Sequence, residues 1–366
     1  MHSDLVLVIV VGTALAFDFT NGFHDTANAV ATSISTRAMS PRRAVALASL
    51  LNFVGAFLSL EVAATVANGI VNPDLITPEI VFAGLIGAIF WNLLTWFFGL
   101  PSSSSHALIG GVVGATLAAV GTKGVFGDGL VSKLIVPALI APVLAFTVAG
   151  LGILIAYRIV GGRSPGSVNR GFRSGQIITA SLFSIAHGTN DAQKTMGIIF
   201  LALVANGNLS PGADIPTWVV LSAASAIAAG TYVGGWRIIQ TMGARIIKMD
   251  PAQGFSSQAA GAAVILSASH VGFPLSTTHV VSGGIMGAGA AKRVSAVRWG
   301  VAGNIAIAWV LTLPAAASVG ALTYGITRIF GQGAAGPLVV SIALIILLIV
   351  VFGRRAIEGR TLGAEA

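Results

Sequence analysis

The chain has no cysteine and few charged residues, since Asp, Glu, Lys and Arg make up only 9% of its 366 residues. The lack of cysteine excludes disulfide bonds, thiolate chemistry and cysteine metal sites. A soluble domain carries roughly 25% charged residues, so this chain has too little polar surface to stay in water. Its composition is 55% hydrophobic with a mean hydropathy of +0.89, which predicts a protein whose surface faces mostly lipid.

Long apolar stretches alternate with short polar ones along the whole sequence. Several apolar stretches are too short or too long for one straight crossing, which takes about 20 residues. We therefore expect an all-α polytopic membrane protein with about 10–12 transmembrane segments, some of them broken or re-entrant. No Lys or Arg precedes the first apolar stretch, so we expect an uncleaved first helix rather than a signal peptide.

The net charge of +8 would suit nucleic-acid binding, but the basic residues are not interleaved with aromatic ones on a polar surface. They form short clusters between apolar stretches, at residues 37–43, 158–173 and 292–298. Such clusters are typical of cytoplasmic loops under the positive-inside rule. We expect no nucleic-acid partner and an N-terminus outside the cell.

Two polar motifs each occur twice. GFHDTAN at 22–28 is matched by GTNDAQK at 188–194, and PSSSSH at 101–106 is matched by PLSTTH at 274–279. Both pairs repeat at nearly one interval, which indicates a duplication. The basic clusters place an odd number of crossings in the first half, so the two repeats should be inverted. The predicted domains are a first transmembrane repeat (1–160), a cytoplasmic basic linker (161–175), a second inverted repeat (176–353) and a C-terminal tail (354–366).

The first motif pair places acidic residues at equivalent positions inside apolar stretches. A charge at the bilayer centre costs at least roughly 2.5–3.5 kcal/mol, so Asp25 and Asp191 should be functional. Gly22 and Gly188 are expected to unwind the helix and to present carbonyls to an ion. The predicted ligands of a hard cation are Asp25, Asn28, Asn190 and Asp191. A helix cap or a neutral interhelical hydrogen bond is the simpler alternative.

The two copies of this motif differ where Asn28 is matched by Lys194. An ammonium group can take the place of a bound metal ion, so we expect Lys194 to fill one of two symmetry-related cation positions. The alternative is a lysine that pairs with Asp191 or snorkels to the interface. Asp18 and Glu61 also fall within apolar stretches but lack the repeat pairing.

Each copy of the second motif places hydroxyl groups before a glycine-containing apolar helix, expected at 107–120 and 280–290. Ser or Thr caps a helix, and the free N–H groups of a helix start suit an oxyanion. Helices entering from opposite sides would bring both starts to one central site. The candidate oxyanion donors are Ser103, Ser104, Ser105, Ser276, Thr277 and Thr278. His106 and His279 are candidates for proton coupling or for packing, whereas His187 and His270 are expected to be structural.

Enzymatic activity is not expected. Ser105 precedes His106, but adjacent residues at a helix start seldom bring an imidazole onto the hydroxyl, and no Gly-x-Ser-x-Gly elbow is present. The sequence also lacks a phosphate-binding P-loop, which argues against ATP hydrolysis.

These paired motifs resemble those of the PiT inorganic phosphate transporter family, and HGTNDAQKTMG at 187–197 is especially similar to the low-affinity bacterial phosphate permeases. The resemblance extends from about residue 17 to residue 292. It implies two inverted repeats around a phosphate near the midplane, with the coupling cation, H+ or Na+, beside it. No other cofactor is implied. The implied setting is the plasma membrane of a bacterium, with membrane lipids as partners and commonly a homodimer.

The resemblance also assigns roles by position. Asp25, Asp191, Asn28 and Asn190 would hold the cation or the substrate, and the six hydroxyls would donate to phosphate. His24 stands where the family usually has Asn, and we include it among the candidates for proton coupling. Lys194 stands where sodium-coupled members usually have Asn, and bacterial relatives with this Lys are regarded as proton symporters that carry a neutral metal–phosphate complex. This favours protons and leaves sodium open.

The resulting hypothesis is secondary active import of inorganic phosphate by alternating access. One alternative is another oxyanion such as sulfate, which cannot donate a hydrogen bond to a carboxylate as hydrogen phosphate can. The other alternative is a non-concentrative ion channel. Broken-helix motifs at corresponding points of two inverted repeats favour alternating access over a fixed pore.

Overall fold

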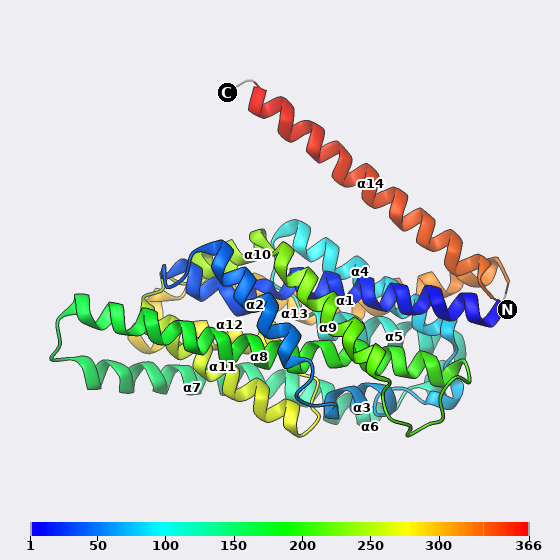
Figure 1. The fold of residues 1–366 in the computed structure, drawn as a ribbon, viewed down its shortest axis with the longest axis horizontal. Helices are drawn as coiled ribbons and strands as arrows, with labels where there is room; N and C mark the ends of the chain where they lie inside the picture. Colours follow the sequence, from blue (N-terminus) through cyan, green and yellow to red (C-terminus); the bar gives the residue numbers. More distant parts are fainter. Residues whose placement is uncertain (1, 332, 365–366) are drawn as a thin grey trace.

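The computed structural model describes the backbone of residues 2–331 and 333–364, and side chains within 4–331 and 333–350. Apart from an isolated bridge between Val71 and Val125, these residues contain no strand, which confirms the all-α fold (Figure 1). The elements are α1 (His2–Ser35), α2 (Pro41–Gly55), α3 (Glu61–Asn68), η1 (Pro73–Leu75), α4 (Pro78–Phe98), α5 (Ser104–Val120), η2 (Gly121–Gly124), α6 (Gly127–Leu130), η3 (Val131–Ile135), α7 (Val136–Val160), α8 (Pro165–Ala205), α9 (Thr217–Val233), α10 (Trp236–Gln240), η4 (Thr241–Arg245), α11 (Pro251–His270), α12 (Thr277–Lys292), η5 (Val294–Ala296), α13 (Trp299–Ile329) and α14 (Ala335–Ala364).

Five helical segments among the described residues are long and apolar enough to cross a membrane: α1, α4, α5 with η2, α6–α7 and α13. A sixth is formed by α9 with α10 and η4, which is bent by 61°. The fold is therefore polytopic and contains a broken helix, as expected. By length and apolarity alone the number of crossings is lower than predicted, because α12 has only 16 residues and α8 and α11 are rich in polar residues.

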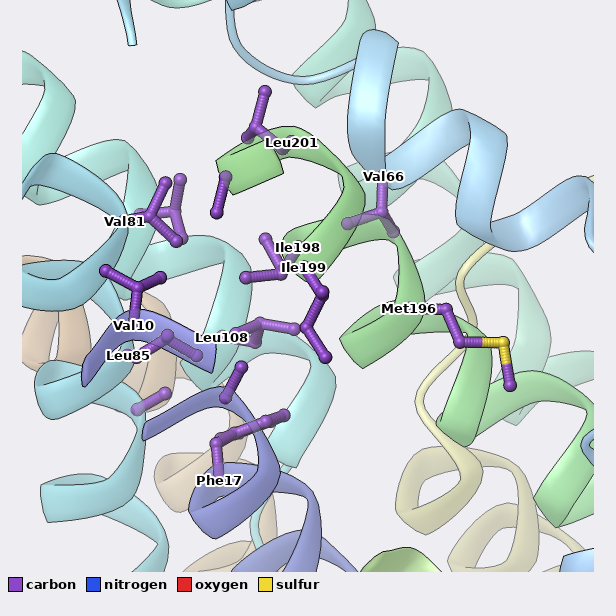
Figure 2. Packing of buried hydrophobic residues seen from close by; sticks show 14 of the residues in the cluster. Val10, Phe17, Val66, Val81, Leu85, Leu108, Met196, Ile198, Ile199 and Leu201 are labelled. Atoms are coloured by element: carbon purple, nitrogen blue, oxygen red, sulfur yellow. The ribbon is translucent and has the colours of Figure 1, made fainter. Parts of the chain in front are cut away.

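Two apolar clusters enclose a polar layer. The first joins the N-terminal half of α1, as far as Phe17, to the C-terminal half of α8 from Ala192 onward; part of it is shown in Figure 2. The second joins α1 from Ala27 onward to the part of α8 that ends at Ala186. The two helices are therefore antiparallel, and the residues between the clusters, 18–26 and 187–191, lie in the polar layer.

Helices α5 and α12 leave this layer in opposite directions, since α5 packs in the first apolar cluster and α12 in the second. Each also packs against a long helix of the other half, α5 against α13 and α12 against α7. Their first residues consequently meet in the polar layer. The same packing pattern occurs twice with opposite direction, which is the arrangement of inverted repeats.

Gly22 and Gly188 do not unwind their helices, contrary to expectation, because α1 and α8 are continuous through both positions. Instead they allow two helix crossings. A Cβ atom on Gly22 would lie 2.3 Å from the carbonyl oxygen of Ile227 in α9, and one on Gly188 would lie 2.1 Å from that of Asn52 in α2. These glycines therefore act by admitting a neighbouring backbone.

The segment expected as a linker is mostly helical, because only the turn at 161–164 lies outside α7 and α8. At the other end, α14 continues through most of the expected tail, and residues 365–366 lie outside the described part of the chain. Figure 1 shows α14 extending away from the bundle.

Replacing Gly22 or Gly188 with Ala should lower the thermal unfolding temperature of the purified protein in detergent, because overpacking costs about 1–3 kcal/mol. Gly12→Ala is the matched control in α1, since no atom lies within 4 Å of the position that its added methyl group would occupy and Ala favours a helix. Equal unfolding temperatures for Gly22→Ala and Gly12→Ala would show that the crossing of α1 and α9 is not tight.

Candidate functional site

Acidic side chains from both halves meet at one hydroxyl group in the polar layer. The Thr277 Oγ1 atom, at the start of α12, lies 3.3 Å from Asp25 Oδ2 and 3.4 Å from Asp191 Oδ2. All three side chains are buried. A hydroxyl has a single proton, so Thr277 donates to one carboxylate at a time. The duplicated acids, predicted to share a site, are thus brought together.

Two hydrogen bonds across the site reproduce the duplication. Asn28 Nδ2 of α1 donates to Thr278 Oγ1 of α12 at 2.9 Å. At the matching positions, Lys194 Nζ of α8 donates to Ser105 Oγ of α5 at 2.5 Å. Each donor therefore holds a hydroxyl at the helix start of the other half. The two halves are joined directly at the site.

The Lys194 ammonium is enclosed by oxygen atoms of three kinds. It lies 2.5 Å from Asp191 Oδ1, 2.5 Å from Ser105 Oγ and 2.8 Å from the carbonyl oxygen of Leu275. Carboxylate, hydroxyl and carbonyl oxygens are also the ligands of hard cations. The pairing with Asp191, which was the simpler alternative, is present, and the ammonium occupies surroundings that would suit a metal cation.

Two histidines lie against the acids. His24 Nδ1 lies 2.6 Å from Asp25 Oδ1, and its Nε2 lies 3.1 Å from Thr95 Oγ1. His187 Nε2 lies 3.3 Å from Asp191 Oδ2, although His187 was expected to be structural. Its position one helical turn before Asp191 was the signal in the sequence. Asp25, His187 and Asp191 offer ligand atoms within 4.8 Å of one another, an arrangement that could hold a metal ion.

The hydroxyl motifs start their helices three residues earlier than predicted, because Ser103 and Ser276 are the N-caps. Ser103 Oγ accepts from the backbone N–H of His106 at 3.1 Å, and Ser276 Oγ accepts from that of His279 at 3.3 Å. These two hydroxyls are therefore engaged as acceptors in capping. Ser104 Oγ is buried and has no hydrogen-bond partner.

Asn190 faces the α11–α12 connection, where its Nδ2 donates to Ser269 Oγ at 2.8 Å. The His106 and His279 rings lie against each other, with centroids 4.8 Å apart, and His279 also contacts Trp309. They line a separate cavity of about 320 Å³, and within the described part of the chain neither ring is hydrogen-bonded to the acids. The structure thus places this pair apart from the carboxylates, and proton coupling through it stays a prediction.

An all-helical membrane protein whose two halves enclose buried acids, an ammonium group and hydroxyls has the layout of a secondary transporter. The chain belongs to the phosphate transporter family, whose sequence profile matches residues 21–165 and 161–320.

Relatives with this fold are named as transporters. The chain is 57% identical to the "probable low-affinity inorganic phosphate transporter" of Mycobacterium bovis, over 89% of this chain and 78% of the relative. The protein of the same name from Bacillus subtilis is 46% identical, over 87% of this chain and 96% of the relative. A solved structure, "the sodium-dependent phosphate transporter", superposes with a TM-score of 0.80 at 26% identity, covering 88% of this chain and 99% of that one. The family and these relatives confirm that the chain is not an enzyme.

Replacing Lys194 with Met should destabilise the protein strongly, because an unpaired buried charge costs about 3–5 kcal/mol. The double variant Lys194→Met/Asp191→Asn should regain part of the lost stability, because it no longer contains an unpaired charge. A double-mutant cycle measures this, with the thermal unfolding temperature in detergent as the readout. The matched control is Lys292→Met, whose partner Asp250 Oδ2 lies 3.1 Å away in a pair that is 56% and 30% exposed. Equal decreases in unfolding temperature for Lys194→Met and Lys292→Met would contradict a buried ion pair between Lys194 and Asp191.

Proposed function

We propose that this protein imports inorganic phosphate by secondary active transport, coupled to a proton or sodium gradient and working by alternating access. The observation that carries the proposal is the shared contact of Asp25 and Asp191 with the Thr277 hydroxyl, at the meeting point of two inverted halves. The names of the relatives supply the substrate. The charge of the site supplies a reason why a cation must accompany the phosphate.

With His24 and His187 counted as neutral, the formal charge of the buried site is negative. Asp18, Asp25 and Asp191 are buried, and Lys194 contributes one positive charge. A phosphate anion entering these surroundings meets repulsion that water does not screen, because the interior has a low dielectric constant. Phosphate can therefore bind only when protons or metal cations arrive with it. This requirement links the two in one transport cycle.

The same charge balance suits a metal–phosphate complex as cargo. Asp25, His187 and Asp191 offer carboxylate oxygens and an imidazole nitrogen to a divalent cation. The cation would reduce the repulsion between the acids and the phosphate. In this form, the Asp25–Asp191 pair holds the metal and the hydroxyls of α5 and α12 face the phosphate oxygens.

The proposed phosphate ligands are the hydroxyls at the two helix starts, Ser103, Ser104, Ser105, Ser276, Thr277 and Thr278. Among them, Ser104 Oγ is buried and has no hydrogen-bond partner in the described part of the chain, so its proton is free to be donated to phosphate. Hydrogen phosphate can in turn donate its own proton to Asp25 or Asp191, whereas sulfate has no proton to donate. The carboxylates therefore favour phosphate over sulfate.

The helices that cover the site support the proposal of alternating access. The start of α5 and the start of α12 reach it from opposite sides, and the bent α9–α10 segment and the break between α2 and α3 interrupt the surrounding helices. Rocking of one half against the other would open one helix start at a time.

Location in the plasma membrane, an outside N-terminus and a homodimer are further proposals, and they rest on the basic clusters and the family resemblance.

Purified protein in proteoliposomes should accumulate labelled phosphate when an inward proton or sodium gradient is imposed. Asp25→Asn and Asp191→Asn should each lower the initial rate roughly tenfold or more, since a charge-assisted hydrogen bond contributes about 1.5–3 kcal/mol. Asp74→Asn, which changes an exposed acid, is the control and should leave the rate unchanged. Uptake that never exceeds the external concentration would indicate a channel instead.

Excess unlabelled sulfate should leave phosphate uptake nearly unchanged, because it cannot donate a hydrogen bond to the paired carboxylates. The comparison uses arsenate, a protonated oxyanion of the same shape, as the competitor expected to inhibit. Inhibition by sulfate as strong as that by arsenate would favour a general oxyanion transporter.

A further inference from the structure

Asp18 is a buried acid that adds negative charge to the site but has no ligand role in the proposed mechanism. It lies seven residues before Asp25, two helical turns away on the same face of α1. Its exposed fraction is 0%, and within the described part of the chain neither of its carboxylate oxygens has a hydrogen-bond partner. Asp25 and Asp191, in contrast, each contact basic and hydroxyl side chains.

The unpartnered oxygens around Asp18 form a cluster. The Asn21 and Thr195 side chains are its polar neighbours and could donate to its carboxylate after a small shift, but among the described residues Asn21 Oδ1 and Thr195 Oγ1 are buried without a partner in hydrogen-bonding distance. Buried polar atoms in folded proteins are nearly always hydrogen-bonded. Four buried oxygen atoms without a close partner in one place offer the kind of oxygen surroundings that a small cation or a proton requires.

Nearby charged groups do not supply this partner. The charged side chains that face Asp18 are Asp191 and Lys194 on α8. Lys194 Nζ is already held by Asp191, Ser105 and the Leu275 carbonyl, and Asp191 adds repulsion. A buried carboxylate without a counter-charge is strongly unfavourable.

The second half contains no duplicate of this acid. Ser184 occupies the matching position in α8, and its hydroxyl donates to the carbonyl oxygen of Ala180 at 2.8 Å. Conversely, the second half has a built-in positive charge, Lys194, where the first half has Asn28. The asymmetry gives one half a permanent cation and leaves the other half an acid without one.

We propose that Asp18, together with Asn21 and Thr195, binds the exchangeable coupling cation of the transport cycle, a proton or a sodium ion. This inference rests on the proposed function. Both cations would bind in the same way, as one small positive charge on a buried carboxylate with oxygen neighbours. With the cation bound, the site is neutral and the halves can rearrange around it. Without it, the unpaired carboxylate opposes closure, so phosphate and cation move together.

The test separates gradient-driven uptake from exchange. Asp18→Asn keeps the shape of the side chain and removes its charge, so the site stays neutral without a cation. In proteoliposomes, gradient-driven accumulation of labelled phosphate should fall about tenfold or more, whereas exchange of labelled for unlabelled phosphate at equal concentrations should stay within about twofold. Glu61→Gln, an exposed acid in a neighbouring helix, should change neither. Asp18→Glu should retain gradient-driven accumulation.

Two arms identify the cation. One imposes an inward proton gradient without sodium, and the other imposes an inward sodium gradient at equal pH. Asp18→Asn should lose the response to whichever gradient drives the unaltered protein, and Thr195→Val should raise the concentration of that cation needed for half-maximal uptake. An Asp18→Asn protein that still responds to the gradient would overturn the proposal, as would a folded variant that loses exchange as well. Absence of exchange in the unaltered protein would instead refute the proposed function.

Discussion

The structure depends on keeping ionised side chains in a layer that water does not reach. Asp25, Asp191 and Lys194 lie between two apolar clusters, so each charge must be balanced inside the protein. The antiparallel packing of α1 and α8 produces this layer. The start of α1 packs with the end of α8 in one apolar cluster, the end of α1 packs with α8 up to Ala186 in the other, and the polar middle of each helix lies between them. The two carboxylates are therefore surrounded by groups that can donate hydrogen bonds to them: the Lys194 ammonium, the His24 and His187 imidazoles and the Thr277 hydroxyl.

Close helix packing and the charged layer are parts of one arrangement. Gly22 and Gly188 let α9 and α2 approach α1 and α8 at the level of the acids, where a methyl group would meet a backbone carbonyl. Next to these crossings, Asn52 Nδ2 donates to Thr231 Oγ1 at 2.8 Å, so the polar layer extends across the helix interface. The polar layer therefore also holds neighbouring helices together.

Much of this arrangement could be predicted from the sequence, because each motif residue of one repeat can be compared with the residue at the matching position of the other repeat. The matched positions of Asp25 and Asp191 predicted a shared site, and the proline–serine pattern predicted helix starts capped by hydroxyls. The continuity of α1 and α8 could not be predicted, since a glycine serves equally to unwind a helix or to admit a neighbour. His187 was missed because it has no histidine counterpart in the first repeat, and only its helical spacing to Asp191 places it at the site.

The exceptions to the duplication give the two halves different charges at matching positions. Where Asn28 and Lys194 differ, both donate to the matching hydroxyl of the other half, so the contact is preserved while the charge changes. Two exchangeable cation positions in a symmetric ancestor would become one, since Lys194 cannot leave the chain. Asp18, which has no counter-charge of its own, lies within electrostatic reach of Lys194. Of the three buried acids, Lys194 balances one and a cation at Asp18 would balance a second, which leaves one carboxylate to the histidines and hydroxyls around it.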